Sequence, residues 1–200
     1  MKNNMTFTMF GMVLNGIVKK EVHDKKVMDK IKKEYHDVIL RASDIGSDNM
    51  LVGSYALAAY FIAMNRSDGL SPEKNCDIME DGLRKSKIFK AAMGSGDAYF
   101  SEKKMEKRRQ WSKETYERKY KNDWVVDVLE KTDDYEFGFD YHECGVCKLC
   151  KDEGCPELAK YLCRLDYMIV DVMGIQLKRT MTLADGGEKC DFRFIKDSVK

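Results

Sequence analysis

Four of the seven cysteines lie in one short segment, CGVCKLCKDEGCP, which runs from Cys144 to Pro156. Cysteine thiolates bind zinc and iron–sulfur clusters, and they are also strong nucleophiles. The spacing C-x2-C-x2-C-x4-C-P has one residue more before its last cysteine than the usual ferredoxin run. The residues between the cysteines alternate between polar and apolar types, as in a helical turn. The segment therefore combines the ligands of a metal site with the pattern of a helix.

Two further cysteines bear on the metal question. Cys144 and Cys147 are three positions apart and could supply two thiolates to a tetrahedral metal site, which Cys163 or Cys190 would complete after folding. No histidine stands at a matching spacing. The sequence leaves two interpretations open: a zinc or iron site built from these four cysteines, or small buried thiols in ordinary packing. It identifies no cofactor beyond these two candidate metals.

Charged side chains are predicted to lie close to these thiols. Arg179 stands at an alternate position with the apolar residues of its predicted strand, so its guanidinium is expected to point toward the covered face of the sheet. A buried guanidinium there must pair with a carboxylate or a ligand anion. Cys163 and Asp166 are three apart on a helix and can face one pocket. Cys190 points inward from the last strand, whereas Asp191 points to the opposite face. Either a reactive pocket forms between helix and sheet, or Asp166 and Arg179 form a buried ion pair among packed cysteines.

Helical patterns dominate residues 1–121. Apolar spacing predicts a surface helix over residues 21–42 and a buried helix over residues 50–64. Ser71 is the expected cap of a further helix that extends to about Ala92, with proline at its first position.

Two segments close this first part. GSGD, residues 94–97, has neither the full glycine pattern nor the preceding strand of a phosphate loop, so we predict a flexible turn. Residues 101–121 interleave basic residues with aromatics and with glutamates. This mixture favours a solvated helix with ion pairs along it over a nucleic-acid-binding helix.

Residues 122–200 have the pattern of a ββαββ unit. The expected elements are strands at 124–129 and 135–141, a helix between Pro156 and Gly174, and strands at 175–183 and 190–194. We therefore predict an α+β fold, with N-terminal helices followed by a ββαββ unit whose antiparallel sheet is covered by helices. The whole chain, residues 1–200, is expected to be a single domain.

Composition restricts the partners. Thirty-five basic and 34 acidic residues give a formal net charge of +1, so no general attraction to nucleic acid or to a membrane is expected. The apolar run MTFTMFGMVLNGIV is too short to span a bilayer and lacks a cleavage site. An odd number of crowded cysteines does not resemble a secreted disulfide framework. We expect a cytoplasmic protein with reduced thiols; homo-oligomer formation is compatible with the sequence but not determined by it.

Several separated motifs resemble one protein family, the L-2-amino-thiazoline-4-carboxylic acid hydrolases. The resemblance is densest from Asn122 to Phe194 and begins with the line DWVVDVLE. Its recurring elements are Cys144-x2-Cys147, the helix from Glu157-Leu158 to Cys163-x2-Asp166, Arg179-Thr180, and Gly187-x2-Cys190-Asp191-Phe192.

The resemblance implies a hydrolase that opens a cyclic amidine. Water would add at the carbon between ring sulfur and nitrogen, which gives a carbamoyl-cysteine. Such a carbon suits attack by a thiolate or by an activated water. Cys190 or Cys163 is the expected nucleophile, or a metal ligand if a metal is bound. Asp166 is the expected base or orienting group, and His142 is a second candidate base.

On the substrate side, Arg179 is expected to bind the substrate carboxylate in a bidentate fork, with Thr180 and Asp191 as further binding residues. The closing pattern of arginine strand, glycine turn and Cys-Asp-Phe is also similar to the end of the vinyl-reductase-like small-molecule-binding domains. The alternative function is therefore a non-enzymatic sensor module that binds a small molecule or a metal.

Overall fold

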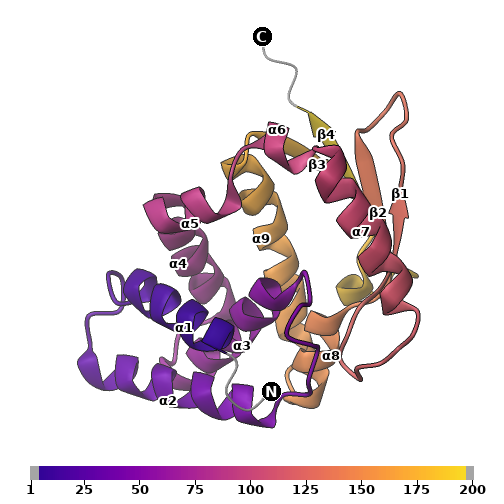
Figure 1. Cartoon of the computed structure of the whole chain (residues 1–200). Coiled ribbons are helices and arrows are strands. Elements are labelled where there is room, and N and C mark those ends of the chain that lie inside the picture. The colour runs from indigo at the N-terminus through magenta and orange to yellow at the C-terminus, as the bar shows by residue number, and fades with distance from the viewer. Residues whose placement is uncertain (1–4, 197–200) are drawn as a thin grey trace.

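The computed structural model describes residues 5–196 and has α+β architecture, which confirms the predicted fold class (Figure 1). The helices of the first part are α1 (Met5–Val18), α2 (Lys25–Arg41), α3 (Val52–Ser67), α4 (Pro72–Lys85), α5 (Lys87–Met93), α6 (Gly96–Tyr99) and α7 (Glu102–Thr115). The second part contains α8 (Gly145–Asp152), α9 (Ala159–Val172) and the 3-10 helices η1 (Pro156–Leu158) and η2 (Leu183–Asp185). Within the described range, none of the helices has the length and apolar character needed to cross a membrane. The predicted domain, 1–200, also includes residues 1–4 and 197–200, which lie outside the described residues.

Within residues 5–196 the strands form one antiparallel sheet in the order β1-β2-β4-β3. They are β1 (Val125–Leu129), β2 (Phe137–Glu143), β3 (Ile175–Lys178) and β4 (Cys190–Lys196). Both predicted hairpins are present, and β4 lies inside the sheet because it pairs with β2 as well as with β3. The pairing of Tyr141 with Cys190 places the start of β4 beside the end of β2.

The two faces of the sheet differ in chemistry. The inner face is aromatic, and Phe137 on β2 stacks on Phe194 of β4 with 4.7 Å between ring centroids. The outer face carries Asp127, Asp140 and Asp191, which are opposite one another across β1, β2 and β4. The faces differ because successive side chains of a strand point to opposite sides of the sheet, and only one side is buried.

Helices α7 and α9 cover the aromatic face. Trp111 of α7 meets the Phe139 ring edge-on at 6.2 Å, and the Arg108 guanidinium lies 4.3 Å from the centre of the Phe137 ring. The charged helix predicted for residues 101–121 is therefore partly buried, although Arg109 does pair with Glu102 along it. The aliphatic stem and flat guanidinium of arginine can pack on aromatic rings, which charge patterning alone does not indicate.

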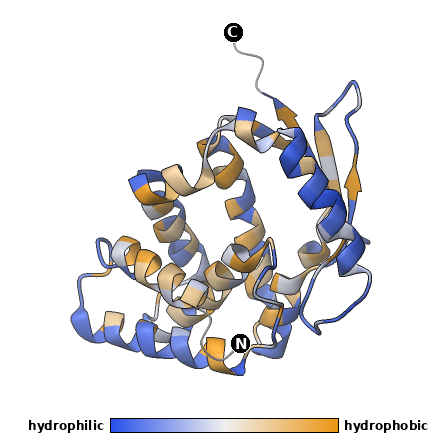
Figure 2. Cartoon of the chain, viewed as in Figure 1, coloured by the Kyte–Doolittle hydropathy of each residue, from blue (hydrophilic) through white to orange (hydrophobic). Residues whose placement is uncertain are grey.

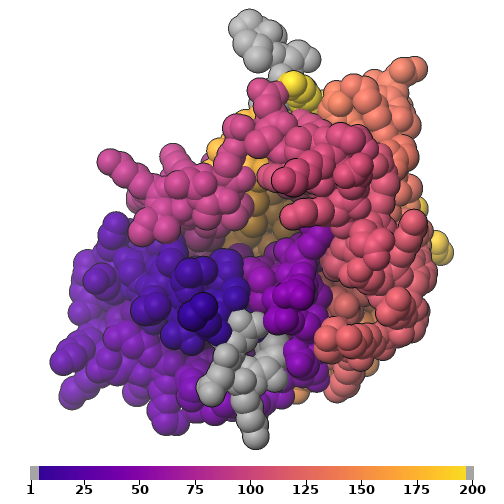
Figure 3. Space-filling view, in the orientation of Figure 1, coloured from indigo at the N-terminus to yellow at the C-terminus, as the bar shows by residue number. Residues whose placement is uncertain are grey.

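Helix α3 is the centre of the helical part and packs against α1, α2, α4 and α8. It is apolar over most of its surface, whereas the outward side of α2 is hydrophilic (Figure 2). In the space-filling view, the surface is hollowed between the N-terminal helices and α7, and gold atoms of the C-terminal part are visible there (Figure 3).

Some predicted boundaries were wrong. The helix predicted from Ser71 to about Ala92 is interrupted at Ser86, whose hydroxyl accepts a hydrogen bond from Phe89 N and so caps α5. The GSGD segment contains the start of the short helix α6 rather than only a turn. The strand predicted for residues 175–183 ends at Lys178 because the next amides bond to a side chain, as described below.

Candidate active site

A cavity of about 100 Å³ lies between α3, α9 and the inner face of the sheet. Three thiols and a carboxylate contribute to its lining, from Cys144, Cys163, Cys190 and Asp166. Most of the remaining lining is apolar and includes Trp124 and Phe192. It is smaller than the cavity of about 150 Å³ that holds a benzene ring, so it can enclose one end of a small ligand, whose remainder must extend to the edge of the cavity.

Separate elements deliver these side chains. Cys144 follows β2 and is the N-cap residue of α8. Cys163 and Asp166 lie one turn apart on α9, and Cys190 is the first residue of β4. The structure therefore brings together Cys163, Asp166 and Cys190, as predicted for a pocket between helix and sheet, and also Cys144, which the sequence grouped with Cys163 and Cys190 only as a metal ligand.

Arg179 pairs with Asp166 at the edge of this cavity. Its Nη1 donates to Asp166 Oδ2 at 2.7 Å, and its Nη2 donates to the Cys163 carbonyl at 3.0 Å. The rings of Tyr167 and Phe192 lie on the guanidinium, each with its centre 4.9 Å away. Only 6% of the Arg179 side chain is exposed. The ion pair and the thiol pocket, posed as alternatives by the sequence, are thus parts of one site.

The pair sets the chemistry of the carboxylate. Burial raises the pKa of Asp166 to about 6, although the charge of Arg179 opposes this shift. A carboxyl group with this pKa can accept a proton at neutral pH and can also donate one, as a general acid–base catalyst must.

The cavity thiols are not equivalent. The neighbouring Cys147 thiol and the first backbone amides of α8, those of Val146 and Cys147, favour a lower pKa for the Cys144 thiol, although the Cys144 side chain makes no capping hydrogen bond. Burial raises the pKa of Cys190 to about 11, despite a 3.2 Å hydrogen bond to its sulfur from Leu183 N. Burial also raises the pKa of Cys163. Cys144 is the cavity thiol whose surroundings favour the thiolate.

A second, open groove of about 480 Å³ lies on the other side of Arg179. Thr180 and Tyr167 contribute to its lining. Asp191 lies behind the turn after β3: its Oδ1 accepts from the amides of Thr180 and Met181 at 2.9 and 2.8 Å, and its Oδ2 accepts from the Thr180 hydroxyl at 2.6 Å. These contacts end β3 and hold the backbone next to Arg179.

His142 is not brought to the cavity. It has the outer-face parity of β2, and its Nε2 lies 2.8 Å from Asp127 Oδ2. Tyr116 also donates to Asp127 at 2.7 Å. This cluster is on the opposite side of the sheet from the thiols.

The cysteines are also the candidate ligands of a metal centre. All seven are free thiols. In the part of the chain that the structure describes, no three His, Cys, Asp or Glu side chains are arranged as ligands of one metal ion. As arranged, Cys144, Cys147, Cys163 and Cys190 do not fit a tetrahedral zinc or iron site, and none of the chemistry below uses a metal. Metal binding by these cysteines stays a prediction, which the metal content of the purified protein would test.

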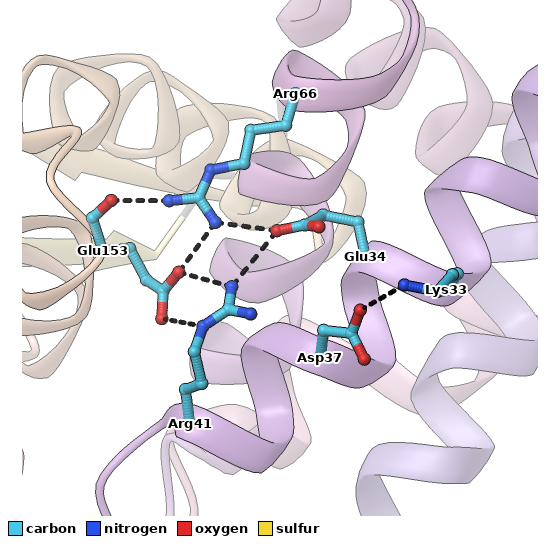
Figure 4. A network of polar contacts seen from close by, with 6 residues as sticks. All are labelled: Lys33, Glu34, Asp37, Arg41, Arg66 and Glu153. Atoms are coloured by element: carbon cyan, nitrogen blue, oxygen red, sulfur yellow. Dashed lines mark hydrogen bonds and ion pairs between the residues drawn. The ribbon is translucent and has the colours of Figure 1, made fainter.

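Helix α8 is held at its far end by an ionic network. Arg41 of α2 and Arg66 of α3 converge on the carboxylate of Glu153, the C-cap residue of α8, at 2.9 and 2.7 Å (Figure 4). Arg66 also donates to the Glu153 carbonyl at 2.5 Å, and Glu34 accepts from both arginines. The network ties the helix that begins at Cys144 to the helical part of the molecule.

The sequence predicts Cys144 as a metal ligand but not as a nucleophile, and it does not predict Trp124 and Tyr141 as cavity residues. No local pattern marks Cys144 as an N-cap residue, because cysteine is not among the residues preferred at that position. Trp124 and Tyr141 look like ordinary core residues in the sequence.

A family model described as L-2-amino-thiazoline-4-carboxylic acid hydrolase matches residues 49–194, well over half of the chain. The chain belongs to this family. The hydrolase-family segment includes α3, α8, α9 and the sheet up to Phe194, and it therefore contains all the residues that line the cavity. Helices α1 and α2 precede it. Neither the curated proteins nor the solved structures contain a match to the chain.

Proposed function

We propose that the protein hydrolyses a small cyclic amidine, L-2-amino-thiazoline-4-carboxylate or a close relative, to a carbamoyl-cysteine. The observation that carries the proposal is the small cavity in which Cys144, Cys163, Cys190 and Asp166 contribute to one lining. Membership of the hydrolase family supports the reaction type.

The cavity and its edge match the parts of such a substrate. A flat five-membered ring would lie against the apolar surfaces of Trp124 and Phe192. Its carboxylate would bind Arg179, which lies between the cavity and the open groove. In this arrangement the substrate carboxylate shares the guanidinium with Asp166 and leaves the amidine carbon facing the thiols.

The reaction needs a nucleophile and a proton carrier. A thiolate, or a water molecule activated by Asp166, attacks the carbon that is bonded to ring sulfur and nitrogen. The bond from this carbon to the ring sulfur then breaks, and the sulfur becomes the thiol of the product. Because the pKa of Asp166 is about 6, its carboxylate is available as a base at neutral pH.

Mass spectrometry of the thiazoline incubated with the purified full chain tests the proposal. The expected result is a product one water heavier than the substrate, and its loss with Asp166→Asn. A folded wild-type protein that forms no product would contradict the proposal for this substrate. If the thiazoline then raised the melting temperature without reacting, the sensor function would replace the hydrolase.

A further inference from the structure

We propose that Cys144 is the sulfur that attacks the amidine carbon. The assignment rests on the proposed function and deepens it, because family membership and cavity do not by themselves distinguish the thiols. It differs from the expectation drawn from the sequence, which favoured Cys190 or Cys163.

Cys144 lies where the cavity meets the start of a helix. It lines the cavity and also precedes the first turn of α8. The first amides of a helix have no partner within it, and their dipoles favour a negative charge at that end. A thiolate at Cys144 therefore lies at the end of α8 where a negative charge is stabilised.

The start of α8 is held in place by close packing. A Cβ added at Gly145 would lie 2.5 Å from the Asn122 carbonyl and 2.8 Å from the Trp124 ring. The first turn therefore packs directly on a residue that lines the cavity. With Glu153 held at the other end, the helix presents Cys144 from a rigid support.

The other two cavity thiols have different surroundings. Cys163 lies within α9, whose backbone amides at that position bond within the helix. Cys190 receives one amide hydrogen bond, from Leu183, and lies at the start of a strand, where no helix dipole acts. Of the three, only Cys144 lies at a helix N-terminus.

The covalent route can be written so that it balances. The Asp166 carboxylate takes the proton of the Cys144 thiol as the sulfur adds to the amidine carbon, the C=N pair moves to the ring nitrogen, and that nitrogen takes the proton from Asp166. The bond from the carbon to the ring sulfur then breaks, and the sulfur leaves with the electron pair as a thiolate. This leaves an isothiouronium group on Cys144.

Water completes the cycle. It adds to the same carbon and gives a proton to the Asp166 carboxylate, and the Cys144 sulfur leaves with its bonding pair. The hydroxyl proton released as the carbonyl forms balances the proton taken up by the product thiol. The sum is substrate plus one water, and no oxidant or reductant takes part.

Thiol mapping in the wild-type full chain tests the assignment without relying on turnover. The protein is treated briefly at neutral pH with chloroacetamidine, which carries an amidine, and separately with iodoacetamide, and modified peptides are quantified. We expect Cys144 to be alkylated at least about tenfold faster than Cys163 or Cys190.

Turnover and trapping form the second arm. Cys144→Ser is expected to lose at least about a thousandfold in kcat/KM, whereas Cys76→Ser, which changes a thiol on α4 outside the cavity lining, should stay within about tenfold of wild type. Acid quenching during turnover should leave the substrate-derived adduct on the peptide that contains Cys144. Circular dichroism checks that each variant is folded, and the wild-type mapping stands even if Cys144→Ser does not fold.

The outcomes separate the two proposals. Selective alkylation of Cys144 without any turnover would contradict the proposed reaction and leave Cys144 as the reactive thiol of the cavity. Turnover with the adduct on Cys163 or Cys190, or an active Cys144→Ser, would overturn the assignment and keep the hydrolase. If all the cavity thiols resisted alkylation until a chelator was added, they would be metal ligands. That result would also overturn the assignment of Cys144 as the nucleophile.

Discussion

At the residue scale, Arg179 has a geometry that lysine cannot reproduce. Its flat guanidinium lies between two rings and donates in two directions, to Asp166 and to a backbone carbonyl. A lysine ammonium keeps the charge but loses the stacking and the fork. Arginine at this position therefore serves both the ion pair and the proposed carboxylate site.

We predict that Arg179→Lys raises KM for the thiazoline by about tenfold or more and lowers kcat much less. Steady-state kinetics provide the measurement. Arg193→Lys is the matched control, since that arginine pairs with Asp140 on the outer face of the sheet and should leave KM unchanged. An unchanged KM in Arg179→Lys would remove this residue from substrate binding.

The raised pKa of Asp166 predicts the acid limb of the pH profile. The proposed base must be ionised, so kcat/KM should be constant above the pKa and fall about tenfold per unit as pH decreases below about 6. Kinetics between neutral and acidic pH measure this limb. Asp127→Asn, which changes an aspartate on the outer face, should keep the same limb. A profile that stays flat well below that pH would show that Asp166 is not the base.

At the element scale, α8 positions Cys144, and the network at Glu153 holds this helix. The Glu153 side chain is only 7% exposed, while Arg41 and Arg66 remain partly solvated. Burial acts to raise the pKa of Glu153, but the hydrogen bonds from the two arginines prevail and lower it. The folded state therefore favours the ionised carboxylate, which stabilises the fold wherever that form predominates.

Glu153→Gln should lower the free energy of unfolding by about 1–2 kcal/mol at neutral pH, a range reduced for the solvent exposure of the arginines. The loss should be complete above the ordinary glutamate pKa of 4.5 and should shrink as pH falls through the lowered pKa of the folded state. Urea unfolding at several pH values measures it. Glu157→Gln, at an exposed position a few residues later, is the control and should have little effect. Equal stability of both variants at neutral pH would contradict the role of the network.

At the scale of the whole molecule, the helical part and the sheet share one hydrophobic core. The cluster of buried residues extends from Phe7 on α1 to Phe194 on β4. Helix α3 lies in the middle of it, and residues of its first turns also line the cavity. The family match begins at Asn49, yet α1 and α2 cover α3.

We therefore predict that a chain limited to residues 49–200 does not fold cooperatively. Removal of α1 and α2 would expose apolar side chains of α3 that are buried in the full chain, including Tyr60, whose ring lies 5.4 Å from that of Tyr35 on α2. Thermal unfolding followed by circular dichroism compares the truncated and full chains. A truncated chain with a sharp transition at the full-chain temperature would show that residues 1–48 are a separate addition.

The sequence by itself determined the α+β class, both hairpins, most of the helices and the inward direction of Arg179. These features depend on local periodicity and capping, which neighbouring residues specify directly. The family resemblance also pointed to Cys163, Asp166 and Cys190, and the structure places them in one cavity.

Only the tertiary structure decided that β4 inserts beside β2, that His142 lies on the far face, and that Cys144 meets the cavity at the start of α8. Strand order and cavity shape depend on contacts between residues distant in the chain, so no local pattern encodes them. The different environments of the three cavity thiols arise in the same way, because burial, helix dipoles and neighbouring donors exist only after the elements have packed.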